Sequence, residues 1–252
     1  MNAKPIAVFD SGVGGISVLR ELVRLMPQEN FIYFGDSANA PYGSRTHEQV
    51  QALTLAAADM LIQRGVKALV VACNTATAAA INLLRETYPD TVIIGIEPAL
   101  KLAADRFPEG RVGIMATEVT LREEKLALQL KRFPGVQADL IAAPGLVELI
   151  EAGKADSPET EALLRSVLSP YIGKLDALVL GCTHYPFAAK AISRVLGDTT
   201  LLDGSEGTAR QTLRCLEQKN LLNPGPGSVQ MENSLHSPEI LRLSMALLED
   251  TL

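Results

Sequence analysis

Short apolar runs alternate with amphipathic segments along the whole chain. Continuous apolar runs such as Ala68–Ala72 suit strands that are buried on both faces, as in a parallel sheet covered by helices. The segments between the runs carry helical periodicity, and alternating strands and helices favour an α/β fold with parallel sheets. The pattern predicts strands at Ile6–Phe9, Phe31–Phe34, Ala68–Ala72, Val92–Gly95, Val112–Met115, Ala138–Ala142, Ala177–Gly181 and Thr200–Leu202.

Helix start signals support this alternation. Thr46 with Gln49 forms a capping box ahead of an apolar face, and Thr120 with Glu123 predicts a second one. Ser157-Pro158 predicts another helix start, with a serine cap followed by proline in the first turn, and Ser237-Pro238 repeats that pattern near the end of the chain.

Two segments of the chain resemble each other. Lys67–Thr75 and Asp176–His184 each contain a buried strand, a small residue, a cysteine and then polar residues that open a helix. Ala, Leu, Val and Cys coincide in register, and the two cysteines are 109 residues apart. Because this interval is too long for a solenoid repeat, the pattern indicates two similar α/β lobes.

We therefore expect two lobes, each a mostly parallel sheet flanked by helices, with the active site in the cleft between them. Residues 1–97 would form the first lobe, completed by the C-terminal segment 207–252, and residues 98–206 would form the second. The stretch Asn223–Gly227 is predicted to be a turn-rich connector before the last helix.

Composition and charge narrow the class of protein. With 252 residues, 47% hydrophobic and 21% charged, the chain has the composition of an ordinary globular protein. The net charge of −6 gives no electrostatic reason to expect nucleic acid or an anionic membrane as partner. The odd count of three cysteines argues against a secreted disulfide framework. Since neither a signal peptide nor a transmembrane run is evident, we expect a cytoplasmic protein with reduced thiols.

Polar clusters follow three of the predicted strands. Ligands of open α/β sheets bind at the carboxyl ends of the strands, and Asp10-Ser11-Gly12, Cys73-Asn74-Thr75 and Cys182-Thr183-His184 all fall there. If the lobes face each other, the two cysteines lie on opposite walls of one cleft. Both also precede helix N-termini, which stabilise thiolates.

Plainer interpretations of these residues exist. Asp10 could be a simple helix cap, and His184 a surface histidine. A metal site built from Cys73, Cys182 and His184 is disfavoured, because the chain has no C-x-x-C or H-x-x-x-H spacing. We therefore expect no metal. Cys215, within the helix-like stretch Thr208–Gln218, is interpreted as an inert buried thiol.

Glycines follow Asp10 closely. Gly12, Gly14 and Gly15 suggest backbone that approaches a ligand, because glycine has no side chain to block the approach. The dinucleotide-binding fingerprint G-x-G-x-x-G is not satisfied, however, since Ser17 occupies the position of the third glycine.

Four ordered stretches carry a resemblance to a known family: Val8–Gly15, Gly35-Asp36 with Ala40–Gly43, Ala72–Ala76 and Gly181–Pro186. In this order they resemble the motifs of the glutamate racemase family, which belongs to the cofactor-independent aspartate/glutamate racemase superfamily. Glu97-Pro98 fits the same pattern, and the match spans nearly the whole chain. The chain departs from the family pattern at Glu123, Leu126 and Ala143.

The resemblance implies interconversion of L-glutamate and D-glutamate without a cofactor, in supply of peptidoglycan synthesis, by a homodimer. Racemisation by proton transfer needs an acid/base group on each face of the carbon, and cysteine, with an ordinary pKa of about 8.5, can serve as thiolate or thiol. By resemblance Cys73 takes the proton from D-glutamate with help from Asp10, and Cys182 takes it from L-glutamate with help from His184. The residues expected to bind substrate are Asp10, Ser11, Tyr42, Gly43, Asn74, Thr75, Thr183 and His184, with Glu151 as a possible helper.

Two other functions stay open at this stage. A related racemase acting on aspartate or a hydantoin would share the fold and both cysteines. A two-lobed protein that only binds an acidic ligand would leave the repeated cysteines without a purpose.

Overall fold

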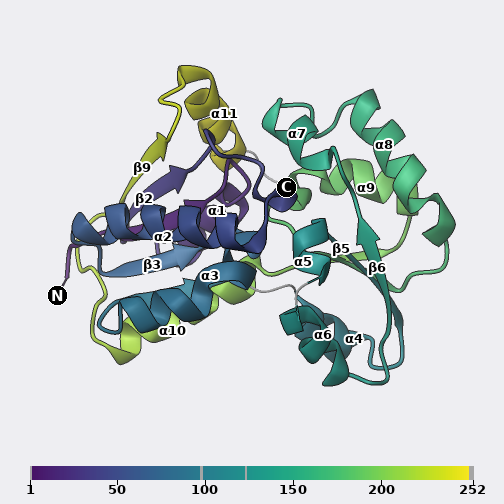
Figure 1. The fold of residues 1–252 in the computed structure, drawn as a ribbon, viewed down its shortest axis with the longest axis horizontal. Helices are drawn as coiled ribbons and strands as arrows, with labels where there is room; N and C mark the ends of the chain where they lie inside the picture. Colours follow the sequence, from purple (N-terminus) through teal and green to yellow (C-terminus); the bar gives the residue numbers. More distant parts are fainter. Residues whose placement is uncertain (1, 97–98, 123, 250–252) are drawn as a thin grey trace.

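Two parallel β-sheets organise the chain, one in each lobe (Figure 1). The structure is a computed structural model that describes residues 2–96, 99–122 and 124–249. The first sheet has the strand order β4-β3-β1-β2-β9, and every neighbouring pair is parallel. Its strands are β1 (Ile6–Asp10), β2 (Asn30–Gly35), β3 (Ala68–Val71), β4 (Val92–Gly95) and β9 (Ser228–Asn233).

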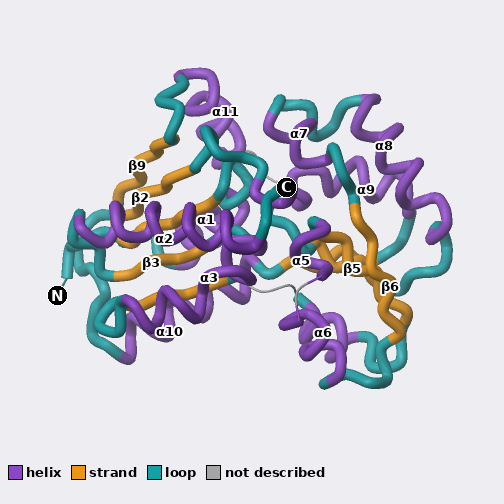
Figure 2. The backbone as a smooth tube through the Cα atoms, viewed as in Figure 1, coloured by secondary structure: helices purple, strands orange, loops and turns teal. Residues whose placement is uncertain are grey.

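Helices cover both faces of the first sheet, as Figure 2 shows. Along β1, Ile6 and Val8 belong to one hydrophobic cluster and Ala7 and Phe9 to another, because successive side chains of a strand point to opposite faces. The first cluster lies under α1 and α10, and the second under α2 and α3. The helical elements of this lobe are α1 (Ile16–Leu25), η1 (Tyr42–Ser44), α2 (His47–Gln63), α3 (Asn74–Thr87), α10 (Ser205–Gln218) and α11 (Pro238–Glu249).

The second sheet has the strand order β6-β5-β7-β8, again with parallel pairs throughout. Its strands are β5 (Arg111–Ala116), β6 (Gln137–Ala142), β7 (Ala177–Leu180) and β8 (Thr200–Asp203). The helical elements around it are α4 (Leu100–Arg106), α5 (Glu118–Arg122), α6 (Glu124–Lys131), α7 (Leu146–Glu151), α8 (Pro158–Leu168), η2 (Ser169–Tyr171), η3 (Tyr185–Ala188) and α9 (Ala189–Leu196).

The two sheets repeat one strand order. Apart from β9, the first reads 4-3-1-2 and the second 8-7-5-6, so β5 to β8 correspond in sequence to β1 to β4. The two cysteine motifs follow β3 and β7, which hold the same place in their sheets. This confirms the predicted fold class of two similar α/β lobes.

Most of the predicted helix starts are confirmed. Thr46 and Gln49 form a reciprocal capping box, and the hydroxyl of Ser157 accepts the backbone N–H of Thr160. The capping role predicted for Thr120 is wrong, because Thr120 lies inside α5. The hydroxyl of Thr117 accepts the N–H of Thr120 instead, at 3.3 Å, and Glu123 lies outside the described residues.

One strand was not predicted. β9 follows the turn-rich stretch Asn223–Gly227 and pairs with β2 at the edge of the first sheet. Val229 and Met231 alternate with polar residues there, which is the signal of a strand with one covered face. The chain thus returns to the first sheet after completing the second. The division near residues 97 and 206 stays a proposal, and residues 97–98 lie outside the described ranges.

The hydrophobic core is continuous across the two lobes. One cluster joins Ile6 and Leu19 of the first lobe to Leu178 and Leu180 of the second. The junction between the lobes is therefore a packed interface, against which the functional loops are held. No helix in the described part of the chain is long and apolar enough to cross a membrane.

Candidate active site

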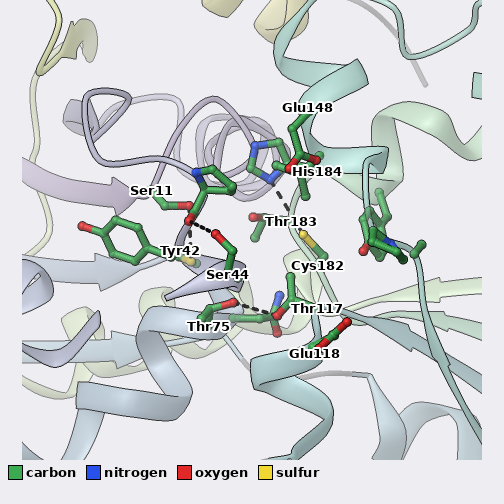
Figure 3. A pocket seen from close by; sticks show the side chains of 18 of the residues that line it. Ser11, Tyr42, Ser44, Thr75, Thr117, Glu118, Glu148, Cys182, Thr183 and His184 are labelled. Carbon is green, nitrogen blue, oxygen red and sulfur yellow. Dashed lines mark hydrogen bonds between the residues drawn. The ribbon is translucent and has the colours of Figure 1, made fainter. Parts of the chain in front are cut away.

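A cavity of about 310 Å³ opens between the lobes, at the carboxyl ends of both sheets (Figure 3). It is lined by the loops that follow β1, β2 and β3 and by those that follow their counterparts β5, β6 and β7. The predicted residues among the lining are Ser11, Tyr42, Gly43, Cys73, Asn74, Thr75, Cys182, Thr183 and His184. Both sheets therefore contribute their functional loops to one site.

Cys73 forms the N-cap of α3. It lies just beyond β3, and its sulfur accepts the N–H of Ala76 at 3.4 Å, because the first N–H groups of a helix have no carbonyl partner within it. The thiol also donates to the hydroxyl of Ser11 at 3.7 Å. Burial, and then the charge of Asp10, raises the pKa of Cys73 to about 12. The structure thus favours the protonated thiol on this wall.

Asp10 is fully buried and does not line the cavity. One carboxylate oxygen accepts the N–H of Gly12 at 2.9 Å, and the other accepts the hydroxyl of Thr183 at 2.9 Å, from the opposite lobe. Burial raises the pKa of Asp10, against the lowering effect of His184 and of these hydrogen bonds. Besides its charge, Asp10 is linked to Cys73 through Ser11, whose hydroxyl donates to Asp10 at 3.5 Å and accepts from Cys73 at 3.7 Å.

Cys182 lies beside a histidine. Its sulfur is 3.8 Å from Nδ1 of His184, and Nε2 of the same ring is 2.6 Å from a carboxylate oxygen of Glu151. Burial alone would lower the pKa of His184, but hydrogen bonds to Cys182 and Glu151 and the charge of Glu151 raise it well above its usual value. Burial opposes ionisation of Glu151, yet its bonds with His184 and Val13 lower its pKa overall. The Cys182 wall therefore carries a protonated imidazole anchored by a carboxylate.

Two of the glycines after Asp10, Gly12 and Gly14, face the other lobe. A Cβ on Gly12 would lie 1.9 Å from a carboxylate oxygen of Glu151, and one on Gly14 would lie 2.3 Å from Nδ1 of His184. Neither glycine lines the cavity. Within this loop Ser11 lines the cavity, whereas Gly12 and Gly14 make room for Glu151 and His184 rather than for a ligand, and the N–H of Val13 donates to Glu151 at 2.8 Å.

The remaining predicted residues differ in what they offer a ligand. The hydroxyl of Tyr42 donates to Asp36 at 2.7 Å and points away from the other labelled lining residues (Figure 3), so it is already engaged. The hydroxyl of Thr75 bonds with that of Thr117 across the lobes at 3.1 Å. Oδ1 of Asn74 is buried without a hydrogen-bond partner, which leaves it free to accept from a ligand.

Several lining residues were not predicted. They come mainly from the loops after β2, β5 and β6 and are Pro41, Ser44, Thr117, Glu118, Ala142, Ala143, Pro144, Gly145, Val147, Glu148 and Tyr185. Ala143, one of the departures from the family pattern, lines this cavity together with both cysteines. The equivalence of β5 and β6 to β1 and β2 is the signal that could have identified these loops.

The cavity has little cationic character. Among its described lining residues there is no lysine or arginine, and His184 provides the positive charge. No group of three or more His, Cys, Asp or Glu within residues 2–96, 99–122 and 124–249 is arranged to hold a metal ion. Cys215 is half-buried in α10 and does not line this cavity.

The sequence matches a protein-family model over residues 6–212, described as Asp/Glu/hydantoin racemase. A glutamate racemase of Clostridium kluyveri is 48% identical over 252 residues, covering 98% of each chain. A glutamate racemase structure from Bacillus anthracis superposes with a TM-score of 0.90 at 30% identity, covering 100% of this chain and 96% of the other. A Francisella tularensis glutamate racemase in complex with D-glutamate superposes with a TM-score of 0.87 at 28% identity, covering 100% and 96%.

The similarity runs from the strands of the first sheet through the cysteine motifs of both lobes. Its extent goes well beyond a shared fold, because relatives with nearly half of their residues identical cover both chains almost completely. The chain therefore belongs to the Asp/Glu/hydantoin racemase family, as a member of its glutamate racemases.

Proposed function

We propose that this chain interconverts L-glutamate and D-glutamate with Cys73 and Cys182 as its two acid/base groups. The observation that carries the proposal is that both thiols, at equivalent strand ends of two lobes, line one cavity. A planar carbanion held between them can lose its proton to one wall and regain one from the other. No single base reaches both faces so directly.

The two walls are prepared for opposite roles. The pKa of Cys73, raised to about 12 by burial and Asp10, keeps that thiol ready to donate a proton. On the other wall the ring of His184, held by Glu151, contacts the sulfur of Cys182, whose thiol must be deprotonated when the reaction begins from L-glutamate. In this state Cys182 removes the α-proton from L-glutamate, and Cys73 protonates the other face to give D-glutamate. The reverse reaction uses the opposite protonation states, with Asp10 acting through Ser11 on Cys73.

Neutral donors and one cation hold the substrate. The first N–H groups of α3, those of Asn74 and Thr75, have no carbonyl partner in the helix and suit a carboxylate. The buried Oδ1 of Asn74 suits the ammonium group. The hydroxyl oxygens of Ser11 and Thr183, whose protons go to Asp10, can accept from the ammonium group, and the backbone of Tyr42 and Gly43 completes the predicted binding set. As the α-proton leaves, negative charge spreads onto the carboxylate, where fixed N–H dipoles stabilise it most.

Racemisation in heavy water tests the proposal. The wild-type protein should incorporate deuterium at Cα of glutamate as it racemises, and Cys73→Ala and Cys182→Ala should each abolish racemisation. If either variant racemises at the wild-type rate, the two-base assignment is wrong. Turnover of L-aspartate, measured beside that of L-glutamate, tests the alternative substrate and should be far slower.

The predicted homodimer and cytoplasmic location belong to the same proposal. Three free thiols, two of them needed in reduced form for proton transfer, suit a reducing compartment. Light scattering of the purified protein tests the dimer, whose expected mass is twice the 27.0 kDa of the chain.

A further inference from the structure

Ser17 lies at the junction of the lobes, outside the catalytic cavity. It is in the first turn of α1, is 4% exposed, and its hydroxyl oxygen is 2.9 Å from two carbonyl oxygens, those of Gly14 and Thr183. The carbonyl of Gly14 already accepts the backbone N–H of Ser17 at 3.0 Å. The hydroxyl proton of Ser17 is therefore best placed on the carbonyl of Thr183, in the other lobe.

The carbonyl of Thr183 needs such a donor. In the 3₁₀ turn that follows, it would bond to the N–H three residues on, but that residue is Pro186, which has none. The next N–H, of Phe187, donates to His184 instead, at 3.1 Å. A buried carbonyl without a partner is costly, so the turn depends on Ser17.

Thr183 is held by the first lobe at two points. Its hydroxyl donates to Asp10 at 2.9 Å, and its carbonyl accepts from Ser17. Thr183 stands between Cys182 and His184, and its carbonyl belongs to the peptide that joins it to His184. Two bonds from the first lobe thus fix the backbone that carries the whole acid/base pair of the second lobe.

We propose that Ser17 is a positioning residue, which locks the Thr183–His184 peptide and so aims Cys182 at a substrate held by the first lobe. The inference rests on the proposed role of Cys182 as a base. It also gives a purpose to the residue that interrupts the glycine-rich fingerprint after Asp10. A glycine at this position would leave the second cysteine loop without its anchor.

The test compares Ser17→Ala, which loses the hydroxyl, with Ser17→Thr, which keeps it. We expect kcat to fall about ten- to a hundredfold in Ser17→Ala, because small misplacements of catalytic groups are costly, while KM changes little. Ser17→Thr should recover most of the activity. Thr54→Val is the matched control: Thr54 is fully buried and donates to Val50 within α2, so its loss should leave kcat unchanged.

Isotope effects separate positioning from general loss of structure. With substrates deuterated at Cα, Ser17→Ala should show a larger isotope effect on kcat from L-glutamate, because removal of the proton by Cys182 becomes more limiting. From D-glutamate the isotope effect should fall, since Cys73 removes that proton and reprotonation by Cys182 becomes limiting. If Ser17→Ala does not fold, Ser17→Cys, which keeps the shape with a poorer donor, takes its place.

Three outcomes would overturn the inference. Unchanged kcat in Ser17→Ala contradicts it, as does a loss that Ser17→Thr fails to recover, or a loss with the same isotope effects in both directions. Cys182→Ser distinguishes this failure from failure of the proposed function. If Cys182→Ser is inactive while Ser17→Ala is normal, only the positioning role of Ser17 is wrong.

Discussion

The two thiols occupy equivalent places in similar sheets but meet different neighbours. Cys73 caps α3, a helix of 14 residues, and contacts a serine hydroxyl above a buried carboxylate. Cys182 precedes the short η3 and contacts a histidine that Glu151 holds in place. The repeated strand order thus places one thiol on each side of the cavity. The neighbouring charged groups differ, with Asp10 near Cys73 and His184 beside Cys182. A racemase needs both features, since its bases must face each other and differ in protonation.

Removal of either thiol should have the largest effect on racemase activity. Cys73→Ser and Cys182→Ser keep the shape of each wall but replace the thiol with a far weaker acid. Each should lower kcat by about 10² to 10⁴, the range that general acid–base catalysis contributes. Circular-dichroism assays of racemisation in both directions measure this loss. A variant that keeps more than a tenth of the activity would mean that its wall is not essential.

The second test disturbs the contact between Gly14 of the first lobe and the Cys182 loop of the second lobe. Gly14→Ala places a Cβ against Nδ1 of His184, at 2.3 Å, and against the hydroxyl of Thr183, at 2.7 Å. Displacing that loop by even 1 Å should lower kcat by about 10². Gly207→Ala is the matched control, because Gly207 lies in the first turn of α10 and nothing lies within 4 Å of its Cβ. It should leave the activity normal; equal effects of both variants would exclude a special role for Gly14.

The sequence predicted the thiols better than it predicted their surroundings. Apolar runs and the repeated strand–cysteine unit identified eight strands, both walls and the shared cleft, because these depend on local patterns. The contacts of Gly12 and Gly14 with Glu151 and His184 depend instead on how the two lobes dock. Such contacts join residues far apart in the chain. β9 was missed for another reason: its alternation of Val229 and Met231 with polar residues is a weaker local signal than the continuous apolar runs of the other strands.

The third test compares the reactivity of the two thiols. The charge of Asp10 helps to raise the pKa of Cys73, so Asp10→Asn should increase the thiolate fraction there and speed its alkylation by iodoacetamide at pH 8, up to about tenfold for each unit by which the pKa falls. His184→Asn removes the cation beside Cys182 and should slow alkylation of that residue. Peptide mass spectrometry follows each site separately. Equal changes at both cysteines in either variant would contradict the division of roles.

The smallest effect concerns the stability of the Cys182 wall. His184 faces Cys182 and Glu151, with Asp10 nearby, and its pKa in the folded protein is raised well above its ordinary value of about 6.5. Between about pH 6.5 and the higher pKa of the folded protein, the folded state keeps a proton on His184 that the unfolded chain has released. The resulting stability is complete below about pH 6.5 and is lost as the pH rises through the folded pKa. It amounts to about 1.4 kcal/mol for each tenfold difference in proton affinity between the folded and unfolded states.

Urea unfolding should therefore show a larger difference in the free energy of unfolding between wild type and His184→Asn at pH 6 than at pH 9. The exposed His236, whose φ of 50° asparagine tolerates, provides the control variant His236→Asn for the loss of a histidine outside the site, measured at the same two pH values. A difference for His184→Asn that is constant over this range would mean that His184 contributes by packing rather than by its charge.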